Sequence, residues 1–158
     1  MATSGKDLSA YDKSGLPDTS AMRIGLVVSE WNAEITGALC RGARETLLAC
    51  GISEDRILRL NVPGSFELAF GCRRLIERER PDAVIAIGSV IRGETPHFDF
   101  VCSATSQGIM DLNLQQPVPV IFCVLTDDTL AQARDRSGGR HGNKGTEAAV
   151  AALKMAAL

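Results

Sequence analysis

Short apolar runs alternate with segments of helical periodicity along this chain, from Arg23 to its end. Four of the runs have the length and the β-branched content that are typical of buried strands. These runs are Ile24 to Val28, Arg56 to Val62, Ala83 to Ile91 and Val120 to Leu125. In the segments that follow them, apolar residues recur at helical spacing, which predicts a helix after each strand.

Glycine, proline and short polar side chains mark the ends of these helices. They place the five helices at about residues 35–50, from a cap at Ser65 through Ile76, from Pro96 to about Leu114, from Asp128 or Thr129 to Gly138-Gly139, and from about Asn143 to Ala157.

Strands separated by helices predict a parallel sheet that is covered on both faces. We therefore expect an α/β protein with a flavodoxin-like three-layer α/β/α sandwich and a four-stranded parallel sheet. Residues 1–21 are polar and predict a flexible N-terminal arm with little to bury, whereas residues 22–158 form a single domain. Ligands of such folds bind outside the carboxyl ends of the strands, near a topological switch point.

Composition narrows the function classes. The chain has 158 residues, 45% of them hydrophobic and 23% charged, with a formal net charge of −2. These values are ordinary for a soluble globular protein and favour neither a nucleic-acid partner nor an anionic membrane. No apolar run approaches the roughly 20 residues that span a bilayer, and the N-terminus lacks a signal-peptide pattern, so we expect a cytoplasmic protein.

The cysteines and histidines predict no metal site. Five cysteines without a Cys-x-x-Cys pair argue against both a disulfide framework and a zinc site, so we expect buried free thiols. The two histidines, His97 and His141, also lack the spacing of metal ligands.

The segment from Gly88 to His97, which reads G-S-V-I-R-G-E-T-P-H, carries the strongest chemical signal. It follows a buried strand, and Pro96 stands where a helix begins. Backbone amides and the helix dipole together favour an anion at such a helix start, so the segment predicts a phosphate site. His97 lies in the first turn as a proton donor beside that site, although a capping or core histidine is the alternative.

Three other strand ends offer further candidates. Trp31 follows the first strand as a platform for a flat heterocycle or as a packing lid. Glu67 follows the second strand, where it accepts ligand hydrogens or complements the helix dipole. Arg136 precedes a glycine-rich turn and suits a phosphate, but it is also typical of a solvated helix end. That turn lacks the Walker spacing of nucleotide-binding loops.

Five motifs in this order closely resemble the 6,7-dimethyl-8-ribityllumazine synthase family, over about residues 22–157. They are W-N after the first strand, V-P-G-S-F-E-L after the second, G-S-V-I-R-G-E-T-P-H-F-D-F-V through the third, P-V-I-F-C-V-L-T in the fourth, and R-x-G-G-x-x-G-N-K-G-x-E-A-A from Arg136 to Ala149.

The resemblance implies a transferase of riboflavin biosynthesis that works without a cofactor. Members condense 5-amino-6-(D-ribitylamino)pyrimidine-2,4-dione with 3,4-dihydroxy-2-butanone 4-phosphate, the penultimate step of the pathway. His97 is then the proton donor, and Glu94, Thr95 and Arg136 hold the phosphate substrate. The residues implied to hold the pyrimidine and its ribityl chain are Trp31, Ser65, Phe66, Glu67, Ser89, Val90, Ile91 and Phe122.

The resemblance also implies a homo-oligomer, because Phe122 and Arg136 come from the neighbouring subunit in this family. Its assemblies are pentamers, decamers or sixty-subunit shells, and we expect the five-fold unit. The chain departs from the commonest pattern in its longer polar arm and in Cys123, where glycine is frequent. One rival interpretation is a binding module without turnover, which the presence of His97 and Arg136 disfavours. A second is a structural shell protein, in which the pocket would be vestigial.

Overall fold

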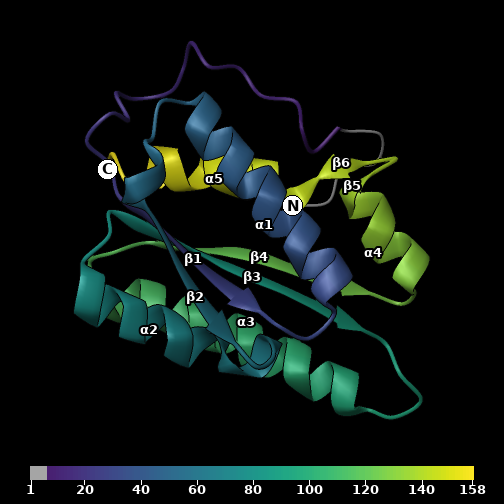
Figure 1. The fold of residues 1–158 in the computed structure, drawn as a ribbon. Coiled ribbons are helices and arrows are strands. Elements are labelled where there is room, and N and C mark those ends of the chain that lie inside the picture. The colour runs from purple at the N-terminus through teal and green to yellow at the C-terminus, as the bar shows by residue number, and fades with distance from the viewer. Residues whose placement is uncertain (1–6) are drawn as a thin grey trace.

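The computed structural model describes residues 7–158, and its centre is a parallel β-sheet (Figure 1). The four strands lie in the order β2-β1-β3-β4, so β1 and β3, which are buried along most of their length, occupy the middle. Their bounds are Ile24–Ser29 for β1, Ile57–Val62 for β2, Ala83–Ile91 for β3 and Val120–Asp127 for β4. The predicted four-stranded parallel sheet is confirmed.

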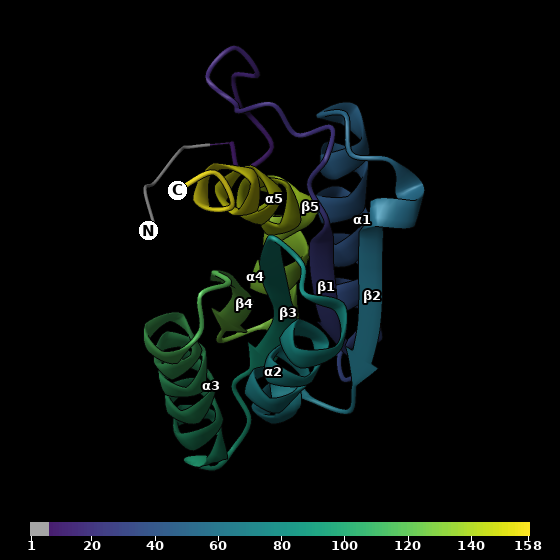
Figure 2. The ribbon, with the colours of Figure 1, turned by 90° about the vertical axis from the view of Figure 1, so that its left-hand side faces the viewer.

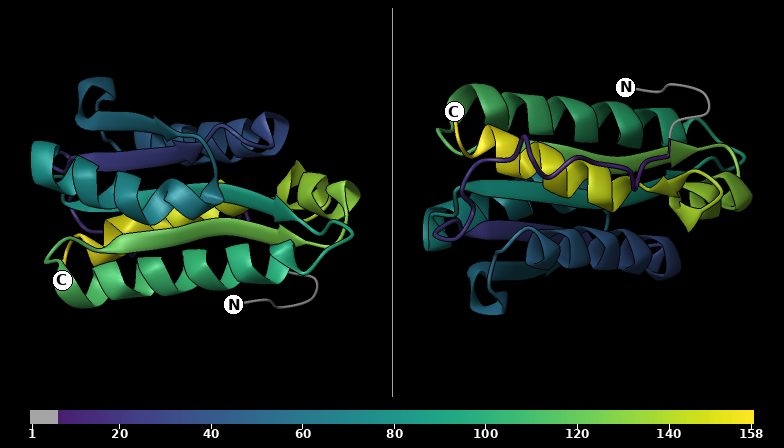
Figure 3. Two further views of the ribbon diagram at one scale, coloured as in Figure 1. Left: turned by 90° about the horizontal axis from the view of Figure 1, so that it is seen from below. Right: turned by 90° about the horizontal axis from the view of Figure 1, so that it is seen from above.

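Helices cover both faces of the sheet (Figures 1 and 3). One face carries α1 (Ala33–Ala49) and α5 (Lys144–Met155), and the other carries α2 (Leu68–Glu79) and α3 (His97–Gln115). A short helix, α4 (Leu130–Arg136), follows β4, and two 3₁₀ turns lie at Glu54–Arg56 and Ser65–Glu67. The three-layer, flavodoxin-like arrangement is therefore confirmed. Among the described residues, no helix is long and apolar enough to cross a membrane.

Two apolar cores lie on the two sides of the sheet, because successive side chains of a strand point to opposite faces. Leu26 and Ile85 pack under α1 and α5, while their neighbours Val27 and Val84 pack against α2 and α3. Both faces are buried, so the central strands read as continuous apolar runs rather than alternating ones.

Two local features differ from the sequence interpretation. The prediction that Ser65 caps α2 is wrong, because Ser65 begins a 3₁₀ turn and Glu67 precedes the helix without a side-chain cap. The glycine-rich turn after α4 forms an unpredicted antiparallel hairpin of β5 (Ser137–Gly139) and β6 (Gly142–Asn143). By contrast, Thr129 does cap α4, in a capping box with Gln132.

The N-terminal segment from residue 7 to residue 21 has no helix or strand and lies over α5 (Figures 2 and 3). It is hydrogen-bonded to the β5–β6 hairpin, where the Leu8 amide donates to the His141 carbonyl at 2.8 Å and the Asn143 amide donates to Ser9 Oγ at 2.9 Å. Leu16 packs against the core and Thr19 is buried, so the expectation of little to bury is corrected for these residues. Residues 1–6 of the expected arm lie outside the described residues.

A close contact between Gly145 of α5 and the backbone of α1 predicts an effect on stability. A methyl group on Gly145 would overlap the backbone carbonyl of Leu39. We expect Gly145→Ala to lower the free energy of unfolding by about 1–3 kcal/mol, because α5 must move. Urea unfolding measures this, with Gly37→Ala as the control, since only an arginine side chain lies near it, at 3.8 Å. Equal stability of the two variants would contradict the described packing.

Candidate active site

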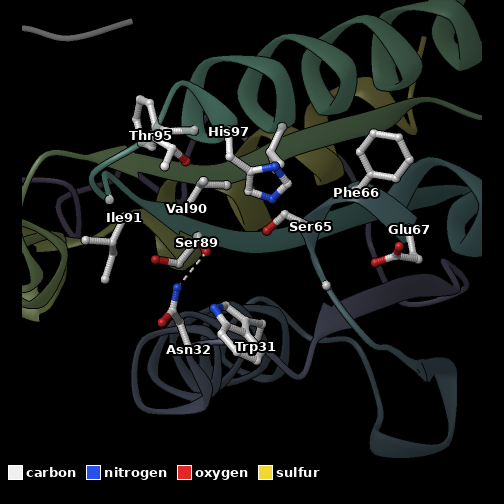
Figure 4. Close-up of a pocket in the computed structure, with 14 residues that line it drawn as sticks. Trp31, Asn32, Ser65, Phe66, Glu67, Ser89, Val90, Ile91, Thr95 and His97 are labelled. Carbon is white, nitrogen blue, oxygen red and sulfur yellow. Dashed lines mark hydrogen bonds between the residues drawn. The ribbon is translucent and has the colours of Figure 1, made fainter.

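A cavity of about 620 Å³ opens at the carboxyl ends of β1 and β3. The loop after β1 and the 3₁₀ turn after β2 supply one part of its wall, and the end of β3 with the start of α3 supplies the rest (Figure 4). This is the edge that the strand-end rule predicts, at the reversal of strand order around β1 and β3. It gathers these predicted residues: Trp31, Ser65, Phe66, Glu67, Ser89, Val90, Ile91, Thr95 and His97.

Trp31 forms an exposed aromatic wall of the cavity. Its backbone amide donates to the Pro63 carbonyl at 3.1 Å, so the loop after β1 is tied to the end of β2. Yet 73% of the residue's surface is exposed. A packing lid would be buried, so the exposure favours the interpretation of Trp31 as a stacking platform.

Asn32 holds this loop against β3, a role that the sequence interpretation missed. Its side-chain Nδ2 donates to the Ser89 carbonyl at 2.9 Å (Figure 4). The backbone of Asn32 is left-handed, with φ of 56°. Asparagine tolerates that conformation better than other side-chain-bearing residues, which was the available signal.

Two buried hydroxyls between Trp31 and His97 have unused hydrogen-bonding capacity (Figure 4). Ser65 Oγ and Ser89 Oγ are both buried and have no hydrogen-bond partner among the described residues. A methyl group on Gly88 would lie 2.6 Å from Ser65 Oγ, so glycine is needed for this close approach. An unpartnered buried hydroxyl is destabilising by about 1–3 kcal/mol, and a polar ligand in the cavity can satisfy both groups.

His97 is the first residue of α3, and its exposed ring points across the cavity towards Ser65 (Figure 4). Within residues 7–158 the ring makes no hydrogen bond, so neither a capping nor a core histidine describes it. The neighbouring Arg92 is engaged elsewhere. Its Nε donates to Asp128 at 2.7 Å, and its guanidinium lies 4.1 Å from the centre of the Phe98 ring.

Comparison with known proteins identifies the family of this chain. The family model of 6,7-dimethyl-8-ribityllumazine synthase matches residues 21–158. The chain belongs to this family. A synthase of that name from Christiangramia forsetii is 57% identical over all of this chain and 95% of the relative. Another from Flavobacterium johnsoniae is 58% identical over 99% of this chain and 82% of the relative. The prediction of an enzyme of the lumazine synthase family is confirmed.

Three residues that the lumazine synthase motifs single out do not line the cavity of their own chain. Glu94 is exposed in the loop before α3. Phe122 lies on β4 beside a smaller cavity of about 180 Å³, next to Met110. Arg136 ends α4, where its Nη1 donates to the Gln132 carbonyl at 3.2 Å.

Burial disfavours the reactive thiolate form of several cysteines. Cys40, Cys72 and Cys123 are buried free thiols, as expected, whereas Cys50 and Cys102 are half-buried. Burial raises the pKa of Cys123 to about 12 and also raises the pKa of Cys72, so both stay protonated at neutral pH. Across residues 7–158, no group of three or more His, Cys, Asp or Glu side chains could hold a metal ion.

The unpartnered hydroxyls predict opposite effects on stability and on binding. Without ligand, we expect Ser89→Ala to raise the free energy of unfolding by up to about 1–3 kcal/mol, because it removes a buried group with no partner. Ligand binding should weaken in the same variant. Urea unfolding checks the first effect. Thr105→Val is the control and should destabilise, because Thr105 Oγ1 donates to the Ser65 carbonyl at 3.1 Å. A less stable Ser89→Ala variant would show that its hydroxyl has a partner.

Proposed function

We propose that the cavity is where this chain condenses 5-amino-6-(D-ribitylamino)pyrimidine-2,4-dione with 3,4-dihydroxy-2-butanone 4-phosphate. The product is 6,7-dimethyl-8-ribityllumazine, and the reaction is the penultimate step of riboflavin biosynthesis. Membership of the family supports the reaction. The observation that carries the site assignment is an exposed Trp31 facing His97 across two unpartnered buried hydroxyls.

The pyrimidine half of the site lies against Trp31. Stacking of the indole on a flat ring contributes about 0.5–1.5 kcal/mol beyond area burial. Polar groups of the ring and of the ribityl chain satisfy Ser65 Oγ and Ser89 Oγ, while Glu67 accepts hydroxyl or amine hydrogens. Phe66, Val90 and Ile91 complete this half from the same chain.

The phosphate half lies at the start of α3. Glu94 and Thr95 precede that helix, whose 19 residues direct a positive dipole end towards the loop. Arg136 supplies the planar guanidinium that suits a phosphate group. Its place at the end of α4, outside the cavity of its own chain, supports its action in the site of a neighbour.

The active enzyme is therefore a homo-oligomer, a pentamer or a multiple of one, in which a neighbour supplies Phe122 and Arg136. Exposed apolar side chains on α2, α3 and β4 support such an association, because large apolar patches mark interfaces. The largest of them are Phe70, Phe100, Met110, Leu114 and Phe122.

The chemistry needs proton transfer and orientation rather than an enzyme nucleophile. The amine of the pyrimidine attacks the ketone, phosphate is eliminated, the ribitylamino nitrogen closes the ring, and two molecules of water are released. Holding two substrates together contributes about 7–11 kcal/mol. General acid–base help from His97 contributes a smaller factor of about 10²–10⁴. No cofactor takes part in this scheme.

The unpaired cysteines support a cytoplasmic location, because free thiols persist in reducing compartments. A nucleic-acid partner has no support from the net charge of −2.

We expect His97→Ala to lower kcat by about 10²–10⁴ without abolishing turnover, because orientation is retained. The initial rate of lumazine fluorescence measures this, with His141→Ala as the control, since His141 lies in the β5–β6 turn. Complete loss of turnover in an assembled protein that binds both substrates would contradict the ranking of orientation above proton transfer.

We expect Arg136→Ala to raise KM for the butanone phosphate by about tenfold to 150-fold, which corresponds to one lost charge-assisted hydrogen bond of about 1.5–3 kcal/mol. Trp31→Ala should instead raise KM for the pyrimidine. Steady-state kinetics with each substrate varied in turn separate the two effects. An unchanged KM for the butanone phosphate in Arg136→Ala would show that Arg136 does not bind this substrate.

Mixed oligomers test whether the site is shared. In a random equal mixture of His97→Ala and Arg136→Ala subunits, about a quarter of shared sites contain both native residues. Co-refolded mixtures should then recover about that fraction of native activity at low butanone phosphate. Activity equal to the mean of the two single variants would show that His97 and Arg136 act within one chain.

A further inference from the structure

Asp127, the last residue of β4, carries a buried carboxylate that the reaction scheme leaves without a role. The residue is 8% exposed, and its Oδ2 has no hydrogen-bond partner among the described residues. Its Oδ1 lies 3.6 Å from Nη1 of Arg136. A buried charge with an unpaired oxygen is costly, and such groups are concentrated at functional sites.

The backbone of Asp127 is firmly held beside the proposed active site. The residue pairs with Ile91 across the β3–β4 ladder, and its carbonyl accepts from the Arg92 amide at 3.0 Å. Ile91 lines the main cavity, so Asp127 ends a strand whose paired neighbour forms part of the cavity wall.

The guanidinium group of Arg136 has one edge in contact with its own chain and one edge free of such contacts within residues 7–158. Nη1 meets the Asp127 carboxylate and donates to the Gln132 carbonyl at 3.2 Å. Nε and Nη2 make no hydrogen bond within residues 7–158, and the side chain is 40% exposed. Two parallel N–H groups on one open edge are the geometry that binds a phosphate in a bidentate manner.

We propose that Asp127 is a positioning residue, whose carboxylate holds the Nη1 edge of Arg136 so that the opposite edge binds the phosphate of the substrate. The inference rests on the proposed function, since it acts through Arg136. It adds a residue that none of the family motifs contributed.

Titration of Asp127 gives the role a pH signature. Burial raises the pKa of the Asp127 carboxyl, Arg136 opposes that rise, and the neighbouring Asp128 adds to it. At pH values above this raised pKa, the Asp127 carboxylate is charged and holds Arg136. The carboxylate loses its charge as the pH falls through the pKa. Below the pKa, the native protein and an asparagine variant become alike at this position.

The test is Asp127→Asn, which keeps the side-chain shape and removes the charge. We expect KM for the butanone phosphate to rise by about threefold to tenfold, because a half-buried ion pair that orients the guanidinium is lost. The values of kcat and of KM for the pyrimidine should stay within about twofold of native. The ratio of the variant KM to the native KM should approach one as the pH falls.

Asp135→Asn is the charge-matched control, because Asp135 adjoins Arg136 in the chain but pairs with Arg140 at 3.0 Å. We expect this variant to leave KM for the butanone phosphate unchanged. Asp127→Asn should also have no further effect in an Arg136→Ala background, because the proposed role acts only through Arg136.

Several results would overturn the role: an unchanged or lower KM in Asp127→Asn, an equal rise for both substrates, an equal effect of Asp135→Asn, or a KM ratio that does not change with pH. Asp127→Ala, tested in the same way, serves if the asparagine variant does not assemble. Calorimetric titration with inorganic phosphate needs no turnover. Weaker phosphate binding by Asp127→Asn would therefore support the role even in a protein that made no lumazine, and equal binding would refute it.

Discussion

The parallel pairing of β1 with β3 is the constraint on which the rest of the structure depends. Both strands are buried on two faces, so their register is fixed by the two cores and by the β-ladder. Their carboxyl ends therefore meet at one edge, where the chain leaves in opposite directions to form the cavity walls. The hydrogen bond from Asn32 to the Ser89 carbonyl holds the loop after β1 against β3 at that point.

Several groups of the single chain have no partner among residues 7–158. Trp31 and Phe100 are largely exposed, Ser65 and Ser89 have buried hydroxyls without partners, and Asp127 has an unpaired carboxylate oxygen. Each of these is costly in an isolated subunit. The proposed two-substrate site, completed by a neighbouring copy, accounts for the hydroxyls and the aromatic side chains, because substrates would satisfy the hydroxyls and a neighbour would cover the apolar surface. Asp127 instead lies beside Arg136 of its own chain.

Most of the fold could be predicted from the sequence, because the strands are uninterrupted apolar runs and the helices have clear ends. Ser65 has the side chain of a helix cap, but it begins the 3₁₀ turn that precedes α2. The hairpin of β5 and β6 is too short to carry a strand pattern. The role of Asn32 depends on Ser89, which lies 57 residues away and which the sheet brings beside it. The proposed role of Asp127 depends on how α4 turns Arg136 back towards the end of β4.

The central claim is that this cavity joins two substrates, and product formation tests it most directly. The purified protein is mixed with the pyrimidine and the butanone phosphate, and lumazine fluorescence and released phosphate are followed together. We expect both signals to rise in equal molar amounts, and neither signal to appear when one substrate is omitted. Binding of both substrates by the assembled protein without either signal would contradict it.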